Sequence, residues 1–198
     1  MHPLPCAMLL ATAGLLSAAD QPSVTVLVDF DTPPSELSFN LMQKEATTML
    51  GTTGVKLNFK LKSEAAGETF DDVVLMSFKG RCGMDSMPVV LDERGPLAFA
   101  RTMNGEIQPF GVVQCNRVQN TLKKAMWGRD YKQGDALMGR ALGRVVAHEL
   151  YHMLAKTPDH ADTGVTKKAL SGKALMSDKL EFAPQDIEKL HSMYSGLD

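Results

Sequence analysis

The sequence DALMGRALGRVVAHELYHMLAKTP, from Asp135 to Pro158, decides the fold. Its apolar residues recur at intervals of three and four, as Leu137, Met138, Ala141, Leu142, Val145, Val146 and Leu150. This spacing predicts an amphipathic helix with a wide buried face. Asp135 is suited to cap its N-terminus, and Gly139 and Gly143 allow another element to pack closely against it. Because Pro158 cannot continue a helix, we expect this one to end within 155–157.

The segments before this helix carry strand and helix patterns in turn. Residues 24–28 and residues 73–78 are short apolar runs rich in β-branched side chains, typical of buried strands. Residues 55–62 alternate between apolar and polar side chains, which predicts a strand with one face in water. Residues 33–50 have apolar residues at helical spacing, with Thr32 as the expected N-cap. The order strand, helix, strand, strand indicates a βαβ unit.

Two further strands are expected at 97–101 and 110–115, joined by a turn at Asn104 and Gly105. Residues 116–133 read as a polar connection to the long helix. The mixture of strands and helices predicts an α+β fold whose N-terminal lobe is α/β-like.

The rest of the chain forms a smaller unit in this interpretation. We expect an upper lobe at about 20–154 and a lower lobe at about 155–198, closed by a helix near 184–195 that begins at a proline. Two aromatic residues before the long helix, Trp127 and Tyr131, are expected in the core or in the wall of a cleft.

Composition narrows the class of protein. The chain has 198 residues, with 21 Lys and Arg, 23 Asp and Glu, and a net charge of −2. Such a chain has no large positive field for holding phosphates, so nucleic acid is not expected as a partner. Because no apolar run reaches the ~20 residues that a membrane-spanning helix needs, we expect no membrane association after removal of a signal.

The N-terminus resembles a secretory signal. Residues 1–19 contain no charged side chain, and a mostly small and apolar run from Cys6 ends at Ala19. We therefore expect cleavage near Ala19 and a secreted or periplasmic mature chain of residues 20–198. Removal of the signal leaves Cys82 and Cys115, which either form one disulfide or remain two buried thiols.

The predicted helix carries a motif with the chemistry of a zinc site. In HELYH, residues 148–152, the two histidines are four residues apart and therefore lie one above the other on one helix face. His148 and His152 can then direct their ring nitrogens at one Zn²⁺ ion. Glu149 lies beside them, where it can accept a proton from a zinc-bound water.

A catalytic zinc site usually has a third protein ligand. His160 is the nearest histidine, and the break at Pro158 allows the chain to turn back toward the metal. Asp159 and Asp162 are competing donors close by. Glu181 and Glu188, further along, are alternatives for a site with a carboxylate as the third ligand.

These residues resemble the signature of the metzincin metalloproteases, HExxHxxGxxH followed by a methionine-containing turn. His148, Glu149 and His152 match it directly, and Ala174-Leu175-Met176-Ser177 resembles the Met-turn. Ala155 replaces the family's glycine, and His160 comes two residues later than the family's third histidine, so a longer turn is required. The resemblance implies a twisted mixed sheet with two helices and a small C-terminal lobe, with Met176 beneath the metal.

The same resemblance implies the activity. We expect a secreted zinc endopeptidase acting on peptides or proteins as a monomer, with Glu149 as the base and residues 97–103 as the edge strand that binds substrate. Two alternatives remain open: a zincin with a carboxylate third ligand, and a secreted zinc-binding protein without proteolytic activity.

Overall fold

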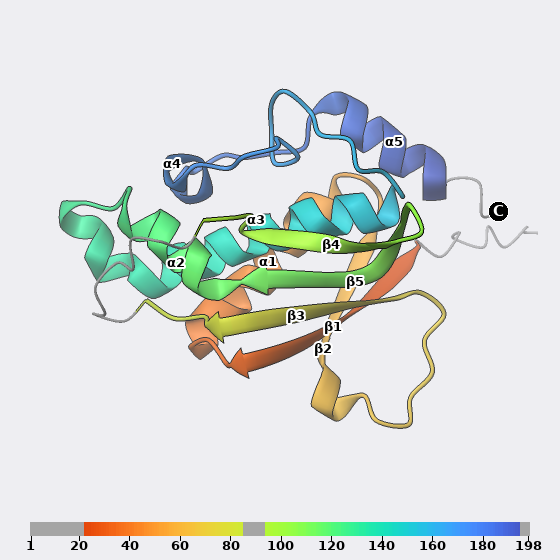
Figure 1. Cartoon of the computed structure of the whole chain (residues 1–198), viewed down its shortest axis with the longest axis horizontal. Helices are drawn as coiled ribbons and strands as arrows, with labels where there is room; N and C mark the ends of the chain where they lie inside the picture. Colours follow the sequence, from red (N-terminus) through yellow and green to blue (C-terminus); the bar gives the residue numbers. More distant parts are fainter. Residues whose placement is uncertain (1–21, 85–93, 195–198) are drawn as a thin grey trace, which may run out of the picture.

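The computed structural model describes residues 22–84 and 94–194 and confirms the α+β fold, with a twisted mixed sheet covered by helices (Figure 1). The five-stranded sheet has the order β2-β1-β3-β5-β4. The strands are β1 (Ser23–Thr32), β2 (Lys56–Leu61), β3 (Val73–Arg81), β4 (Ala98–Met103) and β5 (Glu106–Gln114). The helices are α1 (Glu36–Gly51), α2 (Cys115–Lys123), α3 (Gly134–Leu154), α4 (Gly172–Met176) and α5 (Pro184–Tyr194), with short 3₁₀ helices η1 (Lys62–Glu64) and η2 (Gly128–Gln133).

The two central strands are longer than their apolar runs. β1 pairs in parallel with β3 from Thr25 opposite Val73 to Thr32 opposite Arg81. The last residues of both strands are largely polar, so amino-acid composition does not indicate that the strands continue there. The extra length comes from hydrogen bonding between the two backbones. Because β1 continues to Thr32, the cap of α1 lies further along, at Ser35, whose side chain accepts a hydrogen bond from the Ser38 N–H.

The hairpin between β4 and β5 forms at the predicted turn. Asn104 and Gly105 both have positive φ, 53° and 84°, which gives a two-residue turn of the kind that matches strand twist. β4 pairs with β5 in antiparallel fashion and lies at the edge of the sheet, as the metzincin resemblance implies. In the described part of the chain, no strand pairs with the other side of β4, so its backbone groups there are open to a further strand.

The expectation of a polar connection at 116–133 is wrong, because α2 and η2 occupy much of it. Cys115, Val118 and Leu122 are buried and recur at helical spacing, a signal that the polar composition obscured. Trp127 and Tyr131 are 82% and 60% exposed, so their expected place in the core or a cleft wall is also wrong. They lie in and beside η2, which buries none of its residues.

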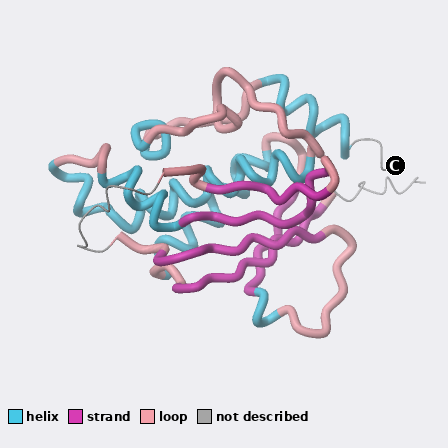
Figure 2. Tube along the Cα trace, viewed as in Figure 1, coloured by secondary structure: helices cyan, strands magenta, loops and turns pink. Residues whose placement is uncertain are grey.

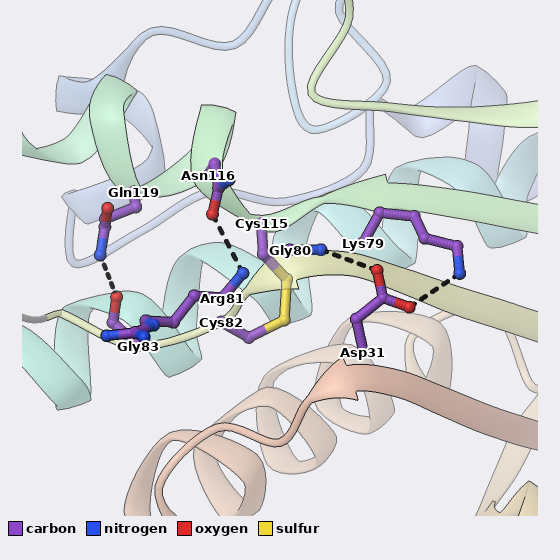
Figure 3. Close-up of a disulfide and its surroundings, with 9 residues drawn as sticks. All are labelled: Asp31, Lys79, Gly80, Arg81, Cys82, Gly83, Cys115, Asn116 and Gln119. Atoms are coloured by element: carbon purple, nitrogen blue, oxygen red, sulfur yellow. Dashed lines mark hydrogen bonds and ion pairs between the residues drawn. A yellow bond between two sulfur atoms is a disulfide. The ribbon is translucent and has the colours of Figure 1, made fainter. Parts of the chain in front are cut away.

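A disulfide joins the end of β3 to the start of α2 (Figure 3). Cys82 and Cys115 have Cα atoms 4.8 Å apart, and both side chains are fully buried. Beside it, the Arg81 N–H donates to Asn116 Oδ1 at 3.0 Å, which adds a second link between the same two elements. The disulfide thus links the end of β3 to the point where β5 passes into α2, and the β4–β5 hairpin lies between the two cysteines in the sequence.

The long helix α3 packs closely against α1 on one face of the sheet (Figure 1). A Cβ atom at Gly139 would lie 2.5 Å from the Ser38 carbonyl oxygen, and one at Gly143 would lie 2.7 Å from that of Met42. The two glycines therefore set the distance between the helices. Asp135 lies in the first turn of α3 and does not cap it, because the helix begins at Gly134.

The segment after α3 is mostly loop, with α4 and α5 as its helices (Figure 2). α5 matches the predicted C-terminal helix, and α3 ends at Leu154, with Ala155 as its C-cap. In the part of the chain that the structure describes, no helix is long and apolar enough to cross a membrane. The expected signal at residues 1–19 lies outside the described residues.

Replacement of Gly139 by alanine is expected to destabilise the protein. The new methyl group overlaps the α1 backbone, at a cost of about 1–3 kcal/mol or more, which exceeds the gain of about 1 kcal/mol in helix propensity. Urea unfolding measures the difference. Gly51→Ala is the matched control, because a Cβ atom there has no neighbour within 4 Å, and its stability should equal or exceed that of the wild type. Equal unfolding midpoints for Gly139→Ala and the wild type would contradict this packing.

Candidate metal centre

Three histidine rings converge at the C-terminal end of α3. His148 and His152 are 9% and 6% exposed, and their Nε2 atoms lie 3.0 Å apart. His160 comes from the loop after the helix, with its ring centroid 5.3 Å from that of His148 and 4.7 Å from that of His152. One nitrogen from each ring lies within 4.8 Å of the others, an arrangement that could hold a metal ion. The structure thus brings together the three histidines that the sequence singled out.

Backbone carbonyls fix the orientation of the two helical rings. His148 Nδ1 lies 2.8 Å from the Val165 carbonyl oxygen, and His152 Nδ1 lies 2.7 Å from that of Thr157. Since a carbonyl only accepts hydrogen bonds, each Nδ1 carries the proton and each neutral ring has an unprotonated Nε2. Two facing lone pairs cannot hydrogen-bond to each other. They suit a shared cation, and tetrahedral zinc with bonds of ~2.0–2.1 Å requires a similar spacing.

Burial keeps these rings neutral at ordinary pH. It lowers the pKa of His148 to about 4, and it also lowers the pKa of His152. The hydrogen bonds to the two carbonyls oppose the shift but do not reverse it. Both lone pairs are therefore available to a metal without competition from protons near neutral pH.

The turn that ends α3 also positions the histidines. Lys156 has a φ of 48°, and the Thr157 N–H donates to the His152 carbonyl oxygen at 3.2 Å, which is the Schellman pattern. The metzincin signature has glycine at the position of Ala155. In this chain the residue with left-handed backbone is the next one, Lys156. Because the Thr157 carbonyl also accepts from the His152 ring, the end of the helix and the orientation of this ring depend on one turn.

A second set of contacts holds the chain between this turn and His160. Thr157 Oγ1 donates to the Asp159 carboxylate at 2.7 Å and accepts from the Asp159 N–H at 3.2 Å. Lys189 of α5 lies 3.4 Å from the same carboxylate. Asp159, a competing ligand by sequence, therefore stabilises the loop.

The other proposed carboxylate ligands are not part of the histidine cluster. Among the described residues, the group that could hold a metal contains His148, His152 and His160 alone. Asp162 is exposed, Glu181 pairs with Lys179 at 3.3 Å, and Glu188 lies on α5. The described carboxylates that the sequence suggested as alternatives therefore lie outside the cluster of three histidines.

Glu149 lies beside the histidines and is only 5% exposed. Burial raises the pKa of its carboxyl group to about 7, and a hydrogen bond from the Ala100 backbone N–H of β4 partly opposes this shift. A carboxyl group with this pKa exchanges its proton readily near neutral pH. Its position connects the helix of the histidines with the edge strand.

A cavity of about 650 Å³ contains the histidines and Glu149. Its lining comes from α3, from residues 95–102 at the edge strand, and from parts of 158–170 in the segment after α3. Figure 1 shows β4 and this last segment on neighbouring sides of α3. The site is therefore a cleft between the sheet edge and the C-terminal segment.

Two arginines that the sequence analysis missed hold the segment with Met176. Arg140 donates to the Met176 carbonyl oxygen at 2.9 Å. Arg144, only 1% exposed, donates to the Ala174 carbonyl oxygen at 2.8 Å and pairs with Glu45 at 2.7 Å. Both arginines lie on the same face of α3 as the histidines, because positions 140, 144, 148 and 152 are four residues apart. This spacing could have identified them in the sequence. Met176 packs against the core, and its place beneath a metal stays a prediction.

A buried acid behind the cluster was also missed. Asp186 on α5 is 3% exposed and accepts a hydrogen bond from the Thr166 hydroxyl. Burial, and then the charge and hydrogen bond of Asp186, raise the pKa of Tyr151. Thr166 follows Val165, whose carbonyl orients His148. Asp186 therefore holds α5 and the backbone at residues 165–166 against α3.

Comparison with known proteins shows a likeness in structure alone. No protein-family model matches the chain, and no curated protein is significantly similar to it in sequence. The crystal structure of archaemetzincin from Methanopyrus kandleri is similar, with a TM-score of 0.52 and 14% sequence identity. The match covers 91% of this chain and 99% of that one. At this identity the likeness establishes the fold.

Lys156→Gly is expected to stabilise the protein. A lysine in the left-handed region is strained by about 1–2 kcal/mol, whereas glycine adopts this conformation freely but loses more entropy on folding. The exposed Lys156 side chain loses no packing, so we expect a net gain of about 0.5–1 kcal/mol in the free energy of unfolding. Thermal unfolding of the zinc-free protein measures it, and a lower melting temperature for the variant would contradict the turn described here.

His160→Ala is expected to weaken zinc binding by more than about 100-fold, since even changes outside the ligand shell cost about 10–100-fold. Asp162→Ala and Glu188→Ala serve as controls and should bind zinc as the wild type does. Competition with a coloured chelator measures the affinities. If His160→Ala retained full affinity and a carboxylate variant lost it, the third ligand would be a carboxylate.

Proposed function

We propose that this protein is a secreted zinc-dependent endopeptidase. In this proposal His148, His152 and His160 hold the zinc ion and Glu149 serves as the general base. The observation that carries it is the convergence of the three rings beside a buried carboxyl group in one cleft. Metal storage alone does not require such an acid, so Glu149 favours an enzyme over a binding protein.

The proposed chemistry divides between the metal and the chain. When bound, zinc supplies a Lewis acid that polarises a carbonyl group and lowers the pKa of a water molecule. Glu149 accepts the proton of the attacking water and delivers it to the departing amine. In the metal-free protein, burial raises the pKa of Glu149 to about 7, so this carboxyl group is not held permanently in one protonation state. The Ala100 N–H holds the carboxylate at the edge of the cleft.

The edge strand provides a means of binding an extended peptide. Among the described residues, β4 pairs with β5 alone, so the backbone groups on its outer side that Glu149 does not bind can add a substrate strand. Ala98, Phe99 and Ala100 of this strand line the same cavity as the histidines. A peptide paired with β4 would therefore pass close to Glu149.

The comparison supports the same class of enzyme. The archaemetzincin neighbour carries in its name the family that the HELYH motif and the Met176 segment resemble. Its likeness extends over nearly the whole of both chains. We propose that the present chain uses the shared fold for the same kind of zinc chemistry.

We also propose that the mature chain acts outside the cytoplasm as a monomer. The uncharged, apolar residues 1–19 support export, and so does the Cys82–Cys115 disulfide, because such bonds persist in oxidising compartments. All residues of the proposed site come from one chain, which supports function as a monomer.

Glu149→Gln tests the proposed function. The amide has the same shape but cannot accept the proton, so cleavage of a denatured protein substrate should fall by about 10²–10⁴-fold. Zinc content, measured by elemental analysis, should stay the same. A chelator should abolish the wild-type activity. Zinc-loaded wild type that cleaves no peptide, or a variant as active as the wild type, would contradict an endopeptidase and favour a zinc-binding protein.

A further inference from the structure

We propose that Lys167 and Lys168 make the cleft selective for peptides that carry a carboxylate close to the bond being cleaved. The carboxylate belongs either to an Asp or Glu side chain or to the peptide C-terminus. The inference rests on the proposed function, because it names the substrate class of the same site.

The charges that line the cleft are mainly positive. Among the described residues of the lining, the charged side chains are Glu149, Lys167 and Lys168. Glu149 is buried and bound to the Ala100 N–H, whereas both lysines are exposed. The exposed charged residues of the lining are therefore two lysines, and the low-dielectric walls of a cleft concentrate the field of such charges.

The backbone of Lys167 is tied to the ligand cluster. Lys167 forms a parallel bridge with Ala161, which directly follows His160, and its N–H lies 3.4 Å from the Gly164 carbonyl oxygen. The two preceding residues are also held, since Thr166 donates to Asp186 and Val165 accepts from His148. Lys167 thus emerges from a fixed strip of backbone beside the histidines.

No acid on the described part of the chain neutralises these lysines. The nearby carboxylates have other partners, because Asp159 contacts Lys189 and Glu181 contacts Lys179. Asp162 is exposed and forms no ion pair with either lysine among the described residues. With respect to the described residues, the two ammonium groups therefore remain available for a carboxylate from a ligand.

The apolar part of the lining limits what else fits. Leu97, Phe99, Ile107 and Leu170 line the same cavity. A free carboxylate without further bulk would leave this surface in water, whereas a peptide covers it. A peptide with an apolar residue next to an acidic one matches both features. Each solvent-accessible ion pair contributes little, so we expect a modest selectivity of about 3- to 10-fold from two lysines.

The test measures peptide binding without cleavage. Fluorescence anisotropy gives Kd values for zinc-supplemented Glu149→Gln protein with fluorescent peptides that differ only by Glu or Gln at one position. A second pair, with a free or an amidated C-terminus, distinguishes the two sources of the carboxylate. The same measurements are made after Lys167→Gln and Lys168→Gln together. Lys173→Gln is the matched control, since it removes an exposed lysine outside the lining.

We expect the carboxylate peptide of at least one pair to bind about 3- to 10-fold tighter than its amide counterpart. The preference should disappear in the double lysine variant and persist in Lys173→Gln, with all variants unfolding at the wild-type temperature. Equal Kd values within both pairs, no detectable binding of any peptide, or a preference that survives loss of both lysines would overturn the inference.

Product analysis separates this inference from the proposed function. Wild-type protein is incubated with the same peptides, and the fragments are identified by mass spectrometry. Cleavage without a carboxylate preference would contradict the inference and leave the peptidase proposal in place. A carboxylate preference in binding without any cleavage would contradict the peptidase proposal and leave the lysine site in place.

Discussion

The site depends on two hydrogen bonds, from the ring Nδ1 atoms of His148 and His152 to backbone carbonyls. They fix both tautomers, so two unprotonated Nε2 atoms face each other 3.0 Å apart inside the protein. Such a pair is repulsive by itself and is relieved by a cation between the rings. The carbonyls belong to Val165 and Thr157, in the segment after α3, so the helix alone does not define the site.

The rest of the fold places that segment. The Schellman turn at Lys156 reverses the chain, contacts of Asp159 lead it to His160, and buried Asp186 fixes it against α3. Further back along the same helix face, Arg144 holds the carbonyls of α4 and pairs with Glu45 of α1. A single face of α3 therefore carries both helical histidines of the cluster and the arginines that hold the C-terminal segment. The opposite side of the cleft comes from β4, whose Ala100 N–H reaches Glu149.

The sequence predicted the parts that depend on local pattern. Periodicity gave the limits of α3 to within a few residues, the pair Asn104-Gly105 gave the β4–β5 turn, and the HELYH spacing identified the buried pair of rings.

The features that the sequence analysis missed depend on contacts between distant segments. Arg144 and Asp186 are buried because each meets a partner far along the chain. The positive φ of Lys156 is set by the Schellman turn, and residue type gives no sign of it. The helix α2 was obscured by polar residues between its apolar positions.

The measurement that tests the central claim most directly is X-ray absorption spectroscopy of the zinc-loaded protein. It reports the number and type of atoms bound to the metal without a crystal. The account predicts three imidazole nitrogens at ~2.0–2.1 Å, with the outer-shell scattering of three histidine rings. A spectrum with two or fewer imidazoles, or with sulfur among the ligands, would contradict the convergence of His148, His152 and His160 on one ion.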